Sequence, residues 1–171
     1  FAVSDIGYGN VKRRINVQNE GDWAKFEFSG RTFTDVSNED WGVALLSDSK
    51  YGFSARDGRL GLSLLRSPID PDLYADQGEH SFIYCFMPHA GSLNDNHVRE
   101  KANVLNSPNL VVITEKAEIS STIPVEIEGV GCRLEILKKA EEGDSYVFRV
   151  VETNGRRGSF IFHGKGQYQE C

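Results

Sequence analysis

Histidine and aspartate, the residue types that most often bind metals, are spread through this 171-residue chain without a recognised metal spacing. None of the four histidines stands in an H-E-x-x-H or paired zinc pattern. They are His80, His89, His97 and His163. Three aspartates, Asp70, Asp72 and Asp76, crowd one proline-rich segment, but Tyr74 and Ala75 break the spacing of a calcium loop. The sequence therefore predicts no metal site in this chain.

The motifs that would indicate nucleotide binding or a nucleophilic serine are also incomplete. Three Gly-x-Gly pairs, at residues 7–9, 129–131 and 164–166, lack the third glycine of a dinucleotide loop and are typical of turns. The segment Gly52–Arg56 matches a nucleophile elbow for four residues and then fails at Arg56. Acid pairs of the glycosidase type cannot be chosen from sequence, because the required separation is spatial. We therefore predict no catalytic residue in this chain.

One long segment, residues 66–80, has a composition that suits ligand binding. It joins two expected strands, and structureless connections of this length in compact domains are usually functional or mobile. Two prolines stiffen it, and Tyr74 supplies an aromatic side chain. Its polar end holds Asp76, Gln77, Glu79 and His80. The segment fits hydrogen bonding to a polyhydroxylated ligand or to a neighbouring domain, and a solvated crossover between sheets is the alternative.

The composition is that of an ordinary globular protein with an acidic balance. The chain has 39% hydrophobic residues and a formal net charge of −6. An acidic balance argues against nucleic acid as a partner, and Lys12–Arg14, the one dense basic run, fits a solvated strand end. No apolar run approaches the ~20 residues that span a bilayer, so no membrane association is expected. The length suits a single domain over residues 1–171.

Cysteine usage indicates a reducing compartment. Three cysteines, Cys85, Cys132 and Cys171, are an odd number without C-x-x-C spacing, which favours neither a disulfide framework nor a zinc ribbon. The chain has no Asn-x-Ser/Thr glycosylation site. A cytoplasmic location is expected, with a lysosomal or secreted one left open.

Apolar residues alternate with polar ones along most of the chain, which predicts strands. The expected strands lie at residues 23–28, 43–46, 51–56, 59–65, 80–87, 110–113, 133–137, 146–151 and 160–162. Asp57–Gly58 has the chemistry of a two-residue hairpin turn. His97–Leu105, which ends before Ser107–Pro108, is the single helix candidate. The pattern predicts an all-β antiparallel sandwich with at most one short helix.

Long collinear stretches of the sequence resemble the C-terminal β-domain of family 38 glycoside hydrolases, the class II α-mannosidases. The main stretch, residues 40–91, reads DWGVALLSDSKYGFSARDGRLGLSLLRSPIDPDLYADQGEHSFIYCFMPHAG. DWAKFEFSGRTFTDVS before it, and VREKANVLNSP and LEILKKAEEGDSYVFRVVETNGRRG after it, match in order. No arginine occurs between Ser67 and His80, where Golgi-type members carry one, so the resemblance is to the bacterial and lysosomal type.

The resemblance implies a large supersandwich of the galactose mutarotase-like type and a share in the hydrolysis of terminal α-mannosides with retention. The family's nucleophile and zinc ligands lie mostly in an N-terminal catalytic domain followed by a helical bundle, and their motifs are absent here. Zn²⁺ is therefore expected in that catalytic domain. The implied partners are those domains of the same polypeptide and a mannoside substrate, and a homo-oligomer is left open. The first residue is Phe1 rather than methionine, which is expected of a piece of a larger hydrolase.

The resemblance also implies a place for the long loop, because β-domain loops of the family approach the catalytic domain. We expect Asp76 and Gln77 to hydrogen-bond sugar hydroxyls, with His80 orienting them. The alternative is an independent carbohydrate-binding module, which needs exposed aromatic side chains that stack on sugars. Its candidates are Trp23, Trp41, Tyr51 and Tyr74. A third alternative is a domain that only packs against its neighbours.

Overall fold

The computed structural model describes residues 1–94, 97–107, 109–111, 113, 125–129, 131–155 and 157–164. The chain forms two compact units, Phe1–Asn109 and Leu110–Cys171, called here the first and the second unit. The prediction of a single domain stays a prediction. Within the described ranges, neither helix is long and apolar enough to cross a membrane.

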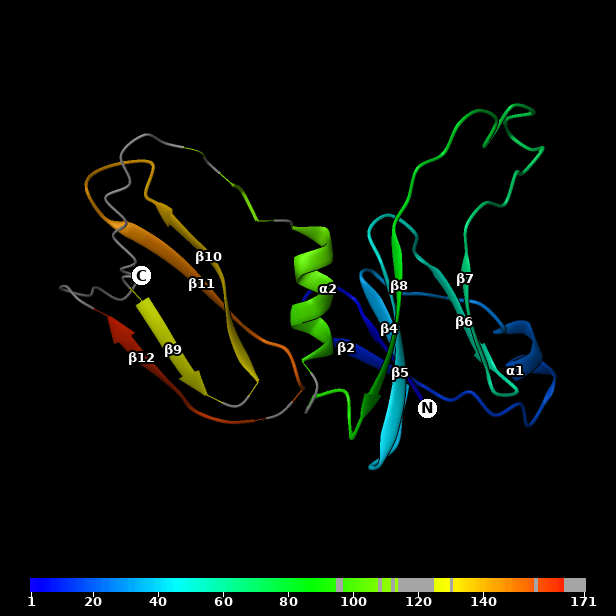
Figure 1. The fold of residues 1–171 in the computed structure, drawn as a ribbon, viewed down its shortest axis with the longest axis horizontal. Helices are drawn as coiled ribbons and strands as arrows, with labels where there is room; N and C mark the ends of the chain where they lie inside the picture. Colours follow the sequence, from blue (N-terminus) through cyan, green and yellow to red (C-terminus); the bar gives the residue numbers. More distant parts are fainter. Residues whose placement is uncertain are drawn as a thin grey trace. The chain divides into compact units, whose positions relative to one another are not determined.

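The first unit is built on a five-stranded antiparallel sheet in the order β2-β1-β4-β5-β8. Its strands are β1 (Ala2–Asp5), β2 (Asn10–Arg13), β4 (Phe33–Ser37), β5 (Trp41–Ser47) and β8 (Tyr84–Ala90). A second sheet, in the order β3-β6-β7, contains β3 (Phe28–Ser29), β6 (Gly52–Arg56) and β7 (Arg59–Ser63). Figure 1 shows helix α2 (Val98–Asn106) on one side of the five-stranded sheet and the β6–β7 hairpin on the other.

Two apolar layers hold these elements together. Phe33, Ala44 and Leu46 of the large sheet are buried against Val98 and Ala102 of α2. On the opposite face the fully buried ring of Phe53 packs over Gly30, where an added Cβ would lie 3.0 Å from the ring and 3.2 Å from Thr34 Oγ1. Gly30 therefore lets the small sheet lie close to the large one. The antiparallel all-β class expected from the sequence is confirmed.

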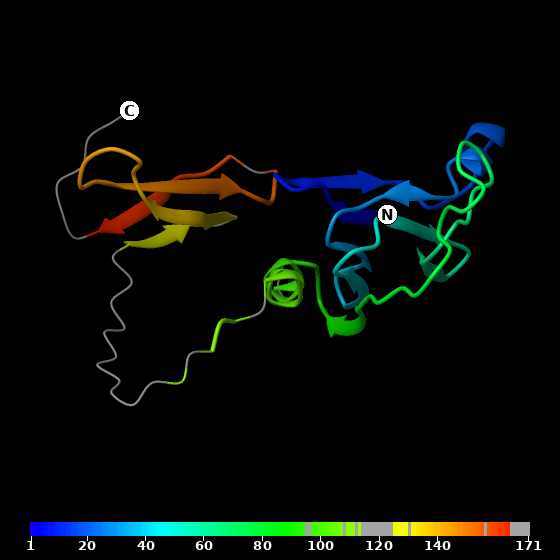
Figure 2. The same cartoon turned by 90° about the horizontal axis from the view of Figure 1, so that it is seen from above.

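The described part of the second unit contains two antiparallel strand pairs. They are formed by β9 (Val125–Gly129) with β12 (Phe160–Gly164), and by β10 (Cys132–Lys139) with β11 (Tyr146–Glu152). The rings of Phe148 in β11 and Phe162 in β12 stack with their centroids 4.5 Å apart, which joins the two pairs. Figure 2 shows these four strands from a second direction.

Several local predictions are confirmed. Asp57 and Gly58 both have positive φ and turn β6 into β7, and the predicted helix is present as α2. The continuous apolar run 43–46 lies within the buried strand β5.

Four expectations are wrong. Residues 20–24, which include the start of the expected strand 23–28, form a helix, α1 (Glu20–Ala24). The Asn19 side chain caps this helix by accepting a hydrogen bond from the Asp22 N–H at 3.0 Å. Helix α1 is also a second helix, where at most one was expected. β8 begins at Tyr84 rather than at His80, so the long loop extends further. The run 110–113 is no buried strand, because Leu110, Val111 and Ile113 are all exposed and outside any strand, while residue 112 lies outside the described residues.

A buried ion pair attaches α2 to the large sheet. Arg99 Nη1 of α2 donates to Asp5 Oδ1 of β1 at 2.8 Å, and both side chains are at least nine-tenths buried. Thr32 Oγ1 donates to the other carboxylate oxygen at 2.6 Å. Since removal of one partner leaves the other charge buried without compensation, this pair is expected to be sensitive to substitution.

We predict that Arg99→Met lowers the free energy of unfolding of the first unit by about 3–5 kcal/mol, the usual cost of an uncompensated buried charge. Both tryptophans lie in the first unit, so urea unfolding followed by tryptophan fluorescence reports on that unit. Arg31→Met, at an exposed arginine, is the control and should change stability by less than about 0.5 kcal/mol. Equal losses in the two variants would contradict the role assigned to the pair.

Candidate binding cleft

A cleft of about 600 Å³ opens between the small sheet and the base of the long loop. Its polar lining comes from Glu27, Ser63, Arg66 and Asp76, and its aromatic lining comes from Phe28 and Tyr51. A few converging polar groups beside aromatic and apolar side chains are the usual composition of a small-ligand site. The cleft is therefore the candidate binding site of the first unit.

Glu27 is the central carboxylate of the cleft. Its side chain is 14% exposed and forms an ion pair with Arg66, the first residue of the long loop. The Ser63 hydroxyl at the end of β7 donates a hydrogen bond to the same carboxylate. Gly52 makes room for it, because an added Cβ there would lie 2.7 Å from Glu27 Oε1. Glu27 thus fixes the start of the loop to the sheet.

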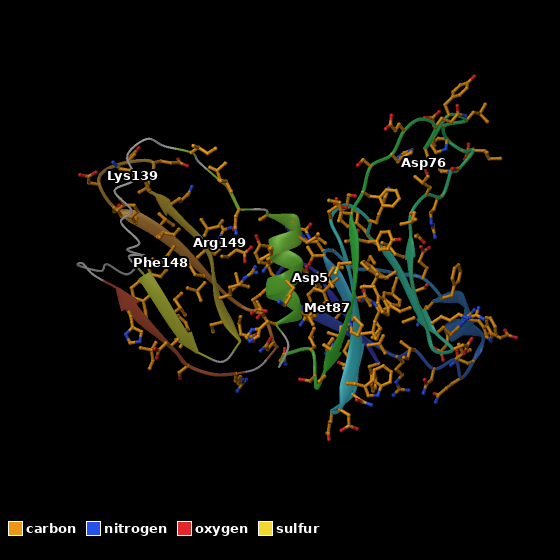
Figure 3. All side chains as sticks on the ribbon, in the orientation of Figure 1. Asp5, Asp76, Met87, Lys139, Phe148 and Arg149 are labelled. Carbon is orange, nitrogen blue, oxygen red and sulfur yellow. The ribbon has the colours of Figure 1, made fainter. Side chains whose placement is uncertain are left out.

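Asp76 closes the loop onto its own base. Its Oδ2 accepts hydrogen bonds from the main-chain N–H groups of Ser67 at 2.8 Å and Arg66 at 3.2 Å. These two donors lower the pKa of the Asp76 carboxyl below its ordinary value, because they stabilise the charged form. Figure 3 shows Asp76 on the loop that extends beyond β7 and β8. The carboxylate has a structural role that the sequence did not indicate.

The three residues expected to bind a sugar are brought together in this loop, but their hydrogen bonds are made largely within it. His80 Nε2 donates to the main-chain oxygen of Asp76 at 2.9 Å. The Gln77 amide Nε2 lies 3.4 Å from the Leu73 main-chain oxygen. Only Asp76 of the three lines the cleft. Among the described residues, Asp76 Oδ1 accepts no hydrogen bond, so this oxygen is available to a ligand.

Sequence reasoning missed Glu27, Ser63 and Arg66 as cleft residues. Glu27 stands far from Asp76 along the chain, and it meets Ser63 and Arg66 only through the pairing of β6 with β3 and β7. Tyr51 was expected only as a candidate of the carbohydrate-binding alternative, and it lines the cleft. All four aromatic candidates, Trp23, Trp41, Tyr51 and Tyr74, are more than half exposed in the chain.

Metal chemistry finds no support in the described part of the chain. No group of three or more His, Cys, Asp or Glu side chains in that part is close enough to hold a metal ion. The buried pair of His89 Nε2 and Asp35 Oδ1, 2.7 Å apart, supplies two such groups only. We therefore assign no step to a metal ion bound by these residues.

We predict that Asp76→Asn speeds hydrogen exchange at the Arg66 and Ser67 amides several-fold at neutral pH, because the charged acceptor is lost. The pKa of Asp76 is lowered in the folded chain, so its contribution is complete above the unfolded value of about 3.9. It is lost as the pH falls through the lower folded value, where the variant and the parent should converge. Asp70→Asn is the control, since the Asp70 carboxylate accepts no such bond within the described loop. Unchanged exchange in Asp76→Asn would contradict the closure of the loop by this carboxylate.

Comparison with known proteins identifies a family domain within the chain. Residues 1–74 match the model of the Glycosyl hydrolases family 38 C-terminal domain. Alpha-mannosidase G of Dictyostelium discoideum is 38% identical over 92% of this chain, and Alpha-mannosidase 2C1 of Homo sapiens is 38% identical over 99% of it. An Alpha-mannosidase of Saccharomyces cerevisiae is 41% identical over 58% of the chain.

The similarity runs through both units of this chain but covers a small part of each relative. The chain spans 15% of the Dictyostelium protein and 17% of the human protein. The family model covers the small sheet and the first part of the long loop, including the cleft residues Glu27, Tyr51 and Arg66. Residues 1–74 therefore belong to the C-terminal domain of the family 38 glycosyl hydrolases, and the chain as a whole is similar to part of several alpha-mannosidases.

Proposed function

We propose that this chain is a noncatalytic β-sandwich region of a retaining α-mannosidase, and that it supports the catalytic domain of the same polypeptide. The observation that carries the proposal is the 38% identity to two alpha-mannosidases over nearly all of the chain. The nucleophile and Zn²⁺ of such an enzyme would belong to the N-terminal catalytic domain, with a helical domain following it. This assignment rests on the family resemblance.

The surface of the first unit supports a role in packing against further domains. β8 is an edge strand of the large sheet as described, and its Tyr84 and Phe86 side chains are largely exposed. Unpaired strand edges with exposed aromatic residues are usually covered in the intact protein. The proposed cover is another domain of the same polypeptide. A cytoplasmic location is proposed as well, on the odd number of cysteines and the absence of a glycosylation site.

The long loop is the proposed contribution to the sugar pocket. Asp76 and His80 hold its shape through bonds to the loop's own backbone, and Asp76 Oδ1 and the Gln77 amide would meet sugar hydroxyls. The tip carries Ile69, Leu73 and Tyr74, all highly exposed. A preformed loop lowers the entropy lost when substrate binds.

We predict that the purified 171-residue chain does not hydrolyse an aryl α-mannoside, with or without added Zn²⁺, whereas the longer enzyme that contains it does. The assay is release of the chromogenic aryl group. The longer enzyme carrying an unchanged C-terminal region is the positive control. Turnover by the isolated chain that one acidic substitution abolishes would refute the noncatalytic role.

In the longer enzyme, we predict that Gln77→Ala raises KM for the mannoside about 2–10-fold with little change in kcat, the size of one lost hydrogen bond. Asp70→Ala, at an exposed residue of the same loop outside its polar end, is the matched control and should leave both parameters unchanged. A KM that moves equally in both variants would argue against a specific contact by Gln77.

An independent carbohydrate-binding module is the second candidate function, and the cleft favours it. Tyr51 is exposed beside Glu27 and Ser63, so a sugar face could stack on its ring while these groups bond hydroxyls.

The two functions are separated by titrating mannose oligosaccharides into the 171-residue chain in a calorimeter. The module predicts saturable heat at millimolar sugar, weakened about 2–10-fold by Tyr51→Ala. Tyr8→Ala, at an exposed tyrosine outside the cleft, is the control. The noncatalytic supporting role predicts no heat.

A further inference from the structure

A second cleft of the first unit, about 400 Å³ in volume, has a strongly basic lining in an otherwise acidic chain. It lies between the segment that follows β2, helix α1 and the β6 strand. Its charged lining residues are Arg13, Arg14, Lys25 and Arg56, with Asp22 and Glu27 as the two carboxylates. The Lys12–Arg14 run, expected to be a solvated strand end, therefore contributes two of its members to a cavity.

Two of these cations have donors without acceptors. Arg13 Nη1 and Arg56 Nη1 are buried from solvent and have no hydrogen-bond partner within the part of the chain that the structure describes. A buried donor left unpaired is costly and rare in folded proteins. The contact of Arg56 with Asp57 uses Nε, at 3.4 Å, and leaves Nη1 unused. Both arginines line the cleft, so an acceptor bound there would give their guanidinium groups a partner.

The two carboxylates in the lining are engaged with other groups. Asp22 Oδ2 accepts the main-chain N–H of Gln18 at 3.0 Å, and Glu27 is bound by Arg66 and the Ser63 hydroxyl. Glu27 is paired with Arg66, whereas Asp22 keeps its negative charge; the four cations of the lining still outnumber its two carboxylates, so the net charge of the cleft is positive.

Both arginines are held in place by aromatic rings. The Arg13 guanidinium lies 5.0 Å from the centre of the Phe28 ring, and that of Arg56 lies 4.3 Å from the Trp23 ring. Stacking fixes the plane of a guanidinium and leaves its edge donors free for a bidentate contact. Burial lowers the pKa of Arg13, because desolvation disfavours the charged form, and a bound anion would offset that effect.

We propose that this cleft binds a small organic phosphate of the phosphomonoester class. Arg13 and Arg56 donate to the phosphate oxygens, and Arg14 and Lys25 add favourable charge. A phosphomonoester carries a charge of about −1.5 to −2 at pH 7 and three strong acceptor oxygens, which suits four cations better than a single carboxylate does. Exposed Phe26, which also lines the cleft, offers an apolar surface to the organic group. The site is distinct in chemistry from the proposed sugar pocket.

The test is calorimetric titration of phenyl phosphate, inorganic phosphate and phenol into the 171-residue chain at constant ionic strength. We expect both phosphates to bind saturably, phenyl phosphate the more tightly, and phenol not to bind. The double variant Arg13→Gln/Arg56→Gln should weaken phosphate binding at least about tenfold, the effect of losing hydrogen bonds to a charged group. The exposed Arg31→Gln, outside the cleft, is the control and should bind as the parent does.

A lysine pair at the same positions separates loss of binding from loss of folding. Arg13→Lys/Arg56→Lys keeps the charge but removes the planar donor fork, and it should bind phosphate more weakly than the parent and more tightly than the glutamine pair. Circular dichroism of each variant checks the fold. Equal phosphate affinity in the parent and the glutamine pair, binding of phenol as strong as that of phenyl phosphate, or no saturable binding by the parent would each overturn the proposal.

Discussion

The buried ion pair between Asp5 and Arg99 is the interaction on which the arrangement of the first unit depends. The carboxylate collects donors from Arg99, from the Thr32 hydroxyl and from the Gly7 N–H, which belong to distant parts of the chain. Arg99 also donates to the Gly9 main-chain oxygen at 3.1 Å. A charge removed from water is tolerated only when its hydrogen bonds are made, so one contact fixes the helix, β1 and the turn before β2 together.

A second buried polar pair, Asp35 with His89, also lies in the large sheet and makes its hydrogen bonds within the protein. Asp35 of β4 receives the Ser37 hydroxyl at 2.6 Å and faces His89 Nε2 at 2.7 Å across β5. Gly42 of β5 lies between them, and an added Cβ there would come within 2.5 Å of the His89 ring. The glycine is therefore required for the side-chain contact between β4 and β8, the two strands that flank β5. Burying polar pairs among apolar residues makes this face of the sheet specific for one register, because a slip would leave a charge unpaired.

The sequence predicted those elements of the fold for which no alternative local structure competed. The hairpin at Asp57–Gly58 and helix α2 were predictable, because their signals lie within a few residues. The alternation around Trp23–Phe28 was misleading, since the Asn19 cap favours a helical turn over a strand that has few partners. The cleft itself was only partly predictable: Asp76 stood in a conspicuous loop, but the pairing of Glu27 with Arg66 depends on sheet register, which a single sequence does not reveal.

Glu27 lines both clefts of the first unit, so the partners of its carboxylate affect the charge of each cleft. Its carboxylate forms an ion pair with Arg66 and accepts a hydrogen bond from the Ser63 hydroxyl. Within the described residues Glu27 forms no ion pair with Arg13 or Arg56, and the Nη1 atoms of these arginines have no hydrogen-bond partner. Glu27 therefore links the cleft proposed to bind sugar with the basic cleft. Substitution of Glu27 would disturb both clefts at once, so the two binding proposals have to be separated by changes at Tyr51 and at the arginines.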